Sequence, residues 1–319
     1  MQPTCNVSSR SSARSKLSVA LSLAVFTLCS CGAEEGVVGR QHANDAGVAA
    51  AVFESEFVTN GGLWSVETVL ARASVNFDQS NGNARDGYVA QLLFPGDATL
   101  TATDNAGPDY VTQLATLDRF SFGTLRTRVN FGGCSGTEEV VQAVLGYFSD
   151  GADHNGNGIT DDIEIDLQIT CSVPHFAYLS VYTDYQATSS GDQFRKLSHI
   201  VDFSTGTEYD TPSDSSDTFV ESGTNANLTR PNLITTGTFY EVGYEWHKGS
   251  VRFFLVDGSE ELTLWTLNDA THVPELPVYL MYNLWHPSTH WFPTTGDADF
   301  PANDVVMQVD WIRFEPSYN

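Results

Sequence analysis

The feature that most constrains the fold is a strand-like pattern that repeats along the chain from Val52 onward. Short alternating or apolar runs are separated by turns rich in Gly, Asn and Asp, and few stretches have the 3.6-residue period of a helix. At least nine strands are expected, at Tyr88–Phe94, Gly123–Phe131, Val140–Tyr147, Asp162–Cys171, Ala177–Asp184, Phe239–Trp246, Ser250–Val256, Val278–Leu284 and Val305–Phe314. The sequence therefore predicts an all-β fold, a two-sheet antiparallel β-sandwich.

Residues 52–319 carry no internal repeat and no break in composition, so we expect a single domain. The stretch from Ser204 to about Thr236 is rich in Ser, Thr, Asp, Asn and Gly with few apolar residues. It is expected to be a long surface excursion.

The N-terminus has the pattern of an export signal. Basic residues precede the apolar run Leu17–Leu28, which is too short to span a bilayer, and no acidic residue occurs before Glu34. The run ends in Leu28-Cys29-Ser30-Cys31, which resembles the bacterial lipobox. We expect residues 1–31 to be a lipoprotein signal peptide with Cys31 as the lipidated residue, and residues 32–51 to be a flexible tether.

This reading predicts an exported protein at the bacterial cell envelope or surface, whose contact with the membrane is the lipid anchor only. The alternative is ordinary signal cleavage nearby, which would secrete the protein. Residues 1–31 contain three of the 15 basic residues and none of the 40 acidic residues. The formal charge of the mature protein is therefore 12 − 40 = −28. Such a surface repels nucleic acid, and a neutral glycan suits it better.

Two cysteines, Cys134 and Cys171, remain after Cys5, Cys29 and Cys31 are assigned to the export segment. In an oxidising compartment they are expected to form a disulfide, worth on the order of 3–4 kcal/mol in the chain-entropy model. Two buried free thiols are the alternative.

The stretch Asp162–Cys171 alternates strictly between apolar and polar residues. A period of two sends Ile163, Ile165, Leu167, Ile169 and Cys171 to one face, and Asp162, Glu164, Asp166, Gln168 and Thr170 to the other. A polar face is also what a solvated strand of an antiparallel sheet shows, so alternation alone leaves its role open.

The segment Glu164-Ile165-Asp166-Leu167-Gln168 resembles the Glu-Ile-Asp-Ile-Glu signature of glycoside hydrolase family 16. Further segments resemble other strands of that family in the expected order, so the resemblance covers Phe53 to Pro316. These segments are Gly123–Arg128, Val144–Phe148, Tyr240–Trp246, Val251–Gly258, Met281–Trp285 and Val309–Phe314. The resemblance implies a jelly roll of the concanavalin A-like lectin/glucanase type, with the signature strand lining a concave face.

By the family's pattern Glu164 is the nucleophile of a retaining glycosidase, Asp166 orients it, and position 168 holds the acid/base glutamate. Here that position is Gln168, which has no proton to transfer, and a spacing longer by one residue reaches Ile169. General acid help is typically worth ~10²–10⁴-fold.

The implied function is endo-acting, retaining hydrolysis of a neutral β-linked polysaccharide, a glucan or galactan. The protein is also expected to be monomeric. With Gln168, three outcomes stay open: a catalytic relic that only binds glycan at the cell surface, a weak enzyme that favours substrates with good leaving groups, or an enzyme that borrows its acid from a loop. If the face binds sugar, the residues expected to contact it are Trp64, Tyr282, Asn283, Trp285 and Trp291.

Just before the signature, the loop that starts at Asp153 has the oxygen-ligand spacing of an EF-hand-like calcium loop. The expected ligands are Asp153, Asn155, Asn157, the Ile159 carbonyl and Asp161. The twelfth position of this pattern is Glu164, so one carboxylate is claimed by two roles. An Asn/Gly-rich turn without a metal is the alternative, and no other cofactor is expected.

Overall fold

The computed structural model describes residues 52–188, 192–214 and 218–317. The predicted signal peptide, Cys31 and the predicted tether lie outside these ranges. Within them the chain forms 17 β-strands and one short 3-10 helix, η1 (Ala226–Leu228). In this part of the chain, no helix is long and apolar enough to cross a membrane.

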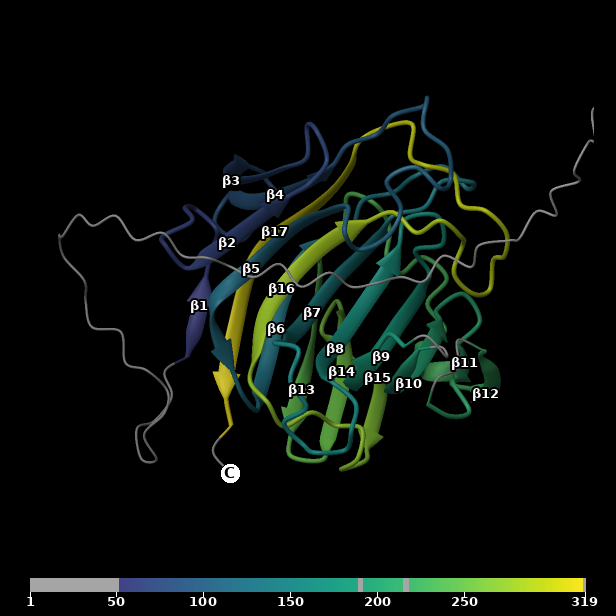
Figure 1. The fold of residues 1–319 in the computed structure, drawn as a ribbon. Coiled ribbons are helices and arrows are strands. Elements are labelled where there is room, and N and C mark those ends of the chain that lie inside the picture. Colours follow the sequence, from purple (N-terminus) through teal and green to yellow (C-terminus); the bar gives the residue numbers. More distant parts are fainter. Residues whose placement is uncertain (1–51, 189–191, 215–217, 318–319) are drawn as a thin grey trace, which may run out of the picture.

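The strands form two antiparallel sheets that lie face to face (Figure 1). The eight-stranded sheet runs β15-β14-β13-β6-β17-β4-β3, with β1 paired to β17. Its members are β1 (Phe53–Ser55), β3 (Ser74–Ser80), β4 (Tyr88–Phe94), β6 (Gly123–Asn130), β13 (Tyr240–His247), β14 (Ser250–Asp257), β15 (Glu260–Asn268) and β17 (Val305–Pro316).

The nine-stranded sheet runs β12-β11-β10-β9-β8-β7-β16-β5-β2, so β8 lies near its middle. Its members are β2 (Trp64–Thr68), β5 (Val111–Phe120), β7 (Val141–Ser149), β8 (Asp161–Thr170), β9 (Phe176–Gln186), β10 (Gln193–Asp202), β11 (Thr207–Asp210), β12 (Val220–Thr224) and β16 (Val278–Trp285). The predicted two-sheet β-sandwich is confirmed.

The hydrophobic core lies between the two sheets and draws on both. From β8 it takes Ile163, Ile165, Leu167 and Ile169, which face side chains such as Tyr244 of the opposite sheet. The period of two read from the sequence therefore sets which face of β8 is core. Burying each such side chain is worth roughly 1.5–3 kcal/mol, which fixes the register of the strand.

The excursion after Ser204 is more ordered than expected. It contains β11, β12 and η1, with β11 paired to β10. These strands are short and mostly polar, and their backbone pairing extends an existing sheet edge. A hydrophobic pattern does not reveal strands of this kind.

Candidate functional site

The outer face of β8 carries four polar side chains in a row, Asp162, Glu164, Asp166 and Gln168. They point away from the core because their neighbours along the strand point into it. Asp162 is 5% exposed and Asp166 is 1% exposed, whereas Glu164 and Gln168 are partly exposed. Glu164 is therefore the more accessible carboxyl of the three.

Aromatic side chains flank Glu164 on both neighbouring strands. Tyr147 of β7 and Tyr182 of β9 stand directly opposite it in the two strand pairings. Lys196 of β10 lies over the Tyr182 ring, with its ammonium 4.9 Å from the ring centroid. Glu164 thus sits between two phenol rings with a cation nearby.

The charges on this face raise the pKa values of its acids. Burial and then the neighbouring Asp166 raise the pKa of Glu164 well above its usual range, and Lys196 opposes this. Burial raises the pKa of Asp166 to about 7. The two carboxyls are hydrogen-bonded to each other. Two like charges this close repel each other, so this repulsion adds to burial in favouring the neutral form of Glu164.

Asp162 lies on the other side of Glu164. Ser149 is opposite it on β7, and hydrogen bonds from Ser149 and Tyr147 reach its carboxyl. Burial and the charge of Glu164 nevertheless raise the pKa of Asp162 to about 7. Desolvation thus outweighs the hydrogen bonds to its charged form.

An aromatic corner lies beyond Gln168. Tyr178 of β9 is directly opposite Gln168, and its ring is 5.1 Å from that of Trp291, centroid to centroid. Trp291 in turn lies 5.7 Å from Trp285 at the end of β16. Asn283, two residues before Trp285, lies on the same outer face. Tyr178 is buried, whereas Trp285 and Trp291 are partly exposed, and exposed ring faces suit stacking against sugar faces.

Two of the five predicted sugar-binding residues are wrong. Trp64 is 4% exposed and Tyr282 is 0% exposed, and both belong to the core between the sheets. The Tyr282 hydroxyl is bonded to Thr127 of the opposite sheet. A glycan on the outer face cannot reach either ring.

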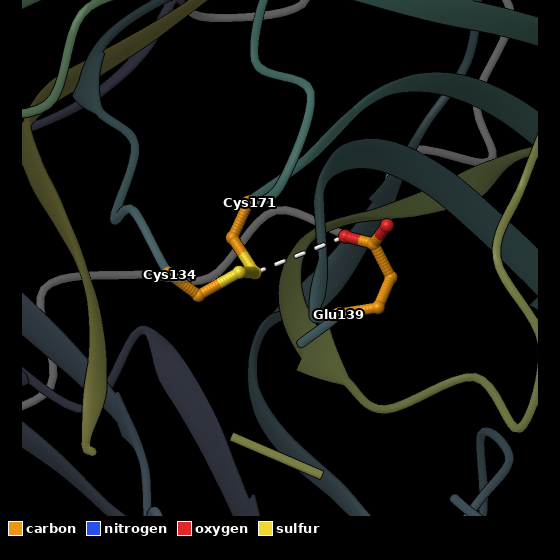
Figure 2. A group of neighbouring side chains, drawn as sticks. All are labelled: Cys134, Glu139 and Cys171. Atoms are coloured by element: carbon orange, nitrogen blue, oxygen red, sulfur yellow. Dashed lines mark hydrogen bonds between the residues drawn. A yellow bond between two sulfur atoms is a disulfide. The ribbon is translucent and has the colours of Figure 1, made fainter. Parts of the chain in front are cut away.

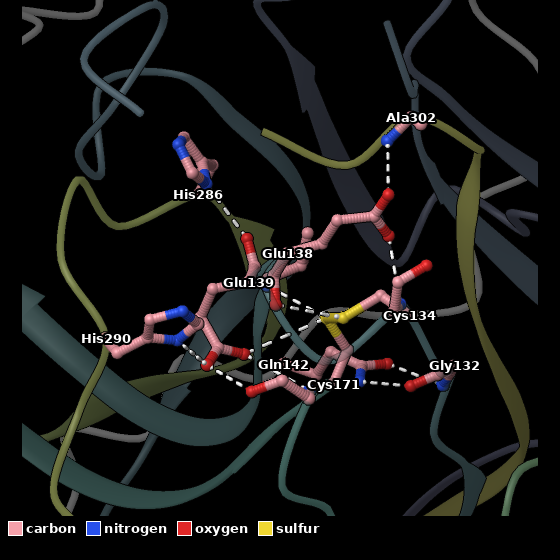
Figure 3. The surroundings of a disulfide bond; sticks show 12 residues. Gly132, Cys134, Glu138, Glu139, Gln142, Cys171, His286, His290 and Ala302 are labelled. Carbon is pink, nitrogen blue, oxygen red and sulfur yellow. Dashed lines mark hydrogen bonds and ion pairs between the residues drawn. A yellow bond between two sulfur atoms is a disulfide. The ribbon is translucent and has the colours of Figure 1, made fainter. Parts of the chain in front are cut away.

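A disulfide and the buried Glu139 lie at the C-terminal end of β8. Cys134 and Cys171 are joined by a disulfide, as expected from the sequence (Figure 2). Glu139 lies two residues before β7, and its carboxylate points toward that disulfide (Figure 3). It is bonded to Ser172 and to His290, with its Oε2 3.1 Å from His290 Nδ1. His290 precedes Trp291, so Glu139 anchors the loop that carries the aromatic corner.

The residues Cys134, Glu139 and Cys171 lie close enough for their side chains to surround one ion. Zinc and similar metals bind cysteine as the thiolate. Both sulfur atoms are used in the disulfide, so this cluster does not fit a metal site.

Hollows of about 370 and 420 Å³ lie elsewhere on the molecule. One is beside Cys134 and Glu138, and the other surrounds Arg230 and Asp257. Neither is lined by residues of the outer face of β8. Arg230 is already paired with Asp257 and Glu260. We place the candidate site on the outer face of β8, because the acids with raised pKa values lie there.

The predicted calcium loop is a compact, internally bonded turn. Asp153 accepts backbone bonds from Gly156, Asn157 and Gly158. The side-chain amides of Asn155 and Asn157 donate to Asp184, and Asn155 also donates to Asp161. Asp161 and Asp184 are buried side by side, and burial with this repulsion raises the pKa of Asp161.

Glu164, in contrast, is bonded to Asp166 on the outer face of β8 and interacts electrostatically with Lys196. Asp184, the second buried carboxylate beside the loop, belongs to β9. The sequence pattern does not include it, because that pattern covers only contiguous residues.

The residues missed on the outer face are Tyr147, Tyr182 and Lys196. Tyr147 and Ser149 lie on the same face of β7, opposite Glu164 and Asp162 of β8 respectively. A predicted pairing of neighbouring strands would have found them. Without the register, nothing in the sequence joins them to Glu164.

Comparisons with known proteins agree with this architecture. No protein-family model matches the sequence, and curated proteins give no match. Among solved structures, a Bacteroides ovatus GH16 protein of a mixed linkage glucan PUL, in complex with a G4G4G3G product, matches with a TM-score of 0.50 and 10% identity. The match covers 82% of this chain and 99% of that one.

Two further solved structures are similar at lower TM-scores. The Bacillus licheniformis β-glucanase is similar at a TM-score of 0.47 and 13% identity, over 84% of this chain and 99% of that one. A Crh5 transglycosylase is similar at a TM-score of 0.48 and 16% identity, over 85% of this chain and 87% of that one. At these identities the fold is what is shared, so the function must be argued from the site.

Proposed function

We propose that the protein hydrolyses internal linkages of a neutral β-linked polysaccharide with retention, as a monomer, and that Glu164 is the nucleophile. The observation that carries this proposal is the partly exposed Glu164 in a row of otherwise buried acids, between two tyrosines and on the same face as Trp285 and Trp291. Perturbed acids grouped on one face are typical of catalytic sites.

Each neighbour has a task in this reaction. Asp166 holds the Glu164 carboxyl through their hydrogen bond, so that one oxygen of Glu164 faces the sugar. Lys196 stabilises the ionised form of Glu164, which is the form that attacks. Trp285 and Trp291 supply stacking surfaces for neighbouring sugar units.

A mixed-linkage β-glucan is the first substrate to test. The formal charge of −25 disfavours anionic polymers, and the Bacteroides ovatus structure of the same fold holds a mixed-linkage product. A β-galactan is the second substrate.

The test is the release of reducing ends from each polymer by the wild type and by Glu164→Gln. We expect wild-type turnover and a loss of about 10⁴-fold or more in the variant, since a nucleophile is removed without changing its shape. Binding of glucan without any turnover would instead make the protein a surface glycan-binding protein.

For the loop after Asp153 we propose a structural calcium ion held by oxygens of Asp153, Asn155, Asn157, Ile159 and Asp161, with Asp184 as a further ligand. Two buried carboxylates and nearby amides are the hard oxygen donors that Ca²⁺ prefers. A half-turn of each amide would present its oxygen in place of its N–H.

Calcium should raise the thermal unfolding temperature of the wild type relative to EDTA, and should do so less in Asp184→Asn. The exposed Asp118→Asn serves as the matched control. Equal unfolding temperatures with calcium and EDTA would contradict the calcium proposal.

We also propose that the protein is exported and anchored through lipid on Cys31, with secretion as the alternative. The disulfide supports an oxidising compartment. Labelling with a radioactive fatty acid should mark the wild type and not Cys31→Ser. Equal labelling of both would contradict the anchor.

A further inference from the structure

We propose that Tyr209 of β11 is a positioning residue that holds the ring of Trp291 in place through Phe292. This rests on the proposed function, in which Trp285 and Trp291 stack against sugar units. The excursion after Ser204, which contains β11, then contributes to glycan affinity without contacting the sugar.

The loop after β16 that carries Trp291 is tied together at its base. Thr289 and Asp297 form an antiparallel bridge across it, and the His290 N–H donates to the Gly296 carbonyl, with 3.0 Å between nitrogen and oxygen. Trp291 lies in the tip, beyond these bonds. The position of the tip therefore depends on the contacts of its side chains.

Phe292, the residue after Trp291, packs its ring against the excursion. The ring centroid lies 4.8 Å from that of Tyr209, at an interplanar angle of 64°, and 5.5 Å from that of Phe219, which precedes β12. Inclined rings at these separations attract each other. The Trp291 ring contacts Tyr178 of β9 instead. Phe292 therefore anchors the tip, and Trp291 is the ring that the tip presents.

Tyr178 joins the tip to the sheet. Its hydroxyl donates a hydrogen bond to the Phe292 carbonyl, and its ring meets that of Trp291 at an angle of 77°. Ile200 of β10 stands opposite Tyr178 in one strand pairing and opposite Tyr209 in the other. The side chains from these three strands form one layer against which the tip packs. A change at Tyr209 therefore acts on Phe292 and, through it, on Trp291.

The burial of this layer is explained by the tip and the excursion, which pack against it. Tyr178 is 4% exposed and Ile200 is 0% exposed, although both lie on the outer face of the sheet. Trp291 is partly exposed. One accessible ring is thus fixed at the edge of a buried cluster, which suits a binding surface that is ordered before the glycan arrives.

The test is a double-mutant cycle on the Glu164→Gln background, with binding of a mixed-linkage oligosaccharide measured by calorimetry. Trp291→Ala should weaken binding roughly 5–30-fold, because a stacking ring is lost. Tyr209→Thr should weaken it roughly 3–10-fold, because binding must then order a loose ring. Added to Trp291→Ala, Tyr209→Thr should change affinity by less than about twofold, since both act through one ring.

Two variants serve as controls on the same background. Tyr209→Phe should bind as its parent does, because the contact with Phe292 is made by the ring. Phe239→Thr removes a partly exposed ring immediately before β13, on the other sheet, and should also leave binding unchanged.

Turnover of glucan separates positioning from chemistry. In otherwise wild-type protein, Tyr209→Thr should raise KM by roughly 3–10-fold and change kcat by less than about twofold, because it weakens binding and leaves Glu164 in place. A lower kcat at unchanged KM would overturn the positioning role.

A measurement without glycan tests the contact itself. With 5-fluorotryptophan in place of the six tryptophans, the ¹⁹F resonance of Trp291 is assigned by its loss in Trp291→Phe. It should move in Tyr209→Thr, whereas the resonance of the buried Trp246 should not. If Tyr209→Thr does not fold, Phe219→Thr removes the other ring that contacts Phe292 and serves in its place.

The proposed function and this inference fail in different ways. Equal affinity of Tyr209→Thr and its parent, or a loss that adds fully to that of Trp291→Ala, would overturn the positioning role and leave Glu164 as the nucleophile. An unchanged Trp291 resonance would do the same. A wild type that neither binds nor cleaves glycan would overturn the proposed function, and the ¹⁹F resonance would then decide whether Tyr209 holds Trp291.

Discussion

Acidic residues on the two outer faces of the sandwich have pKa values shifted in opposite directions. On the eight-stranded sheet, Arg252 is bonded to Glu245 and Glu261, and Arg126 is bonded to Glu241 and Glu261. These bonds lower the pKa values of Glu245 and Glu261. On the nine-stranded sheet, Asp162, Glu164 and Asp166 have raised pKa values.

The difference separates acids that keep their charge from acids that can exchange protons. Glutamates paired with arginine stay ionised and hold strands together at the surface. When carboxyls pack beside one another with few cations nearby, their pKa values rise toward neutral pH. Ionising them in the folded protein then lowers its stability. That cost is tolerated where proton transfer is useful, which points to the nine-stranded face as the functional one.

The largest effect should come from removing a buried acid of the nine-stranded face. The pKa of Asp162 is about 7 in the folded protein against 3.8 ordinarily, so ionisation opposes folding. The penalty is absent below pH about 4, grows as the pH rises, and is complete above pH about 7. Relative to the wild type, Asp162→Asn should therefore gain about 2–4 kcal/mol between pH 4 and pH 8.

Denaturant unfolding of both proteins at the two pH values measures this gain. Asp118→Asn, whose side chain is exposed, should show little change relative to the wild type between the same pH values. A difference between Asp162→Asn and the wild type that does not vary with pH would mean that Asp162 is ionised throughout, as the acids of the other face are.

An intermediate effect should come from the aromatic corner. Trp285→Ala removes a partly exposed ring that contacts Trp291 and should weaken binding of a mixed-linkage oligosaccharide by about 1–2 kcal/mol, or roughly 5–30-fold. Calorimetry on an inactive Glu164→Gln background measures it. Trp265→Ala, on the far sheet, is the control, and equal losses in both variants would show that the effect is on folding.

The smallest effect should come from the eight-stranded face. Arg252→Met leaves Glu245 and Glu261 unpaired and should lower the free energy of unfolding by about 0.5–1 kcal/mol at pH 7, less in high salt. Because those glutamates have lowered pKa values, the loss should shrink as the pH falls below about 4, opposite in direction to Asp162→Asn. Glucan turnover should not change, and a drop in turnover would contradict the division between the faces.

Much of the fold follows from hydrophobic alternation, and its failures have physical reasons. The strand Val111–Phe120 was missed because two inward residues, Thr112 and Thr116, are polar. Their hydroxyls bond to backbone carbonyls at Leu93 and Asp118, so they are buried without an apolar signal. From the sequence alone, a segment with polar residues at such positions resembles a loop, because the carbonyls that accept their hydrogen bonds are not known.

The site was predicted less well than the fold, and Tyr282 shows why. A period of two places Tyr282 with Leu280 and Leu284 on the inner face, and Asn283 and Trp285 on the outer one. The alternation of that strand therefore indicates which of its side chains face outward, whereas the aromatic type of a residue alone does not. Asp162 was on the correct face from the start, and only the strand pairing shows its link to Tyr147 and Ser149.

The most direct test is to identify the carboxyl that bonds to the sugar. Incubation with a 2,4-dinitrophenyl 2-deoxy-2-fluoro-β-laminaribioside should trap the glycosyl-enzyme, because the fluorine slows its breakdown. Peptide mass spectrometry should then find the added disaccharide on Glu164. A label on Asp162 or Asp166, or no label on a wild type that releases dinitrophenolate, would contradict the account.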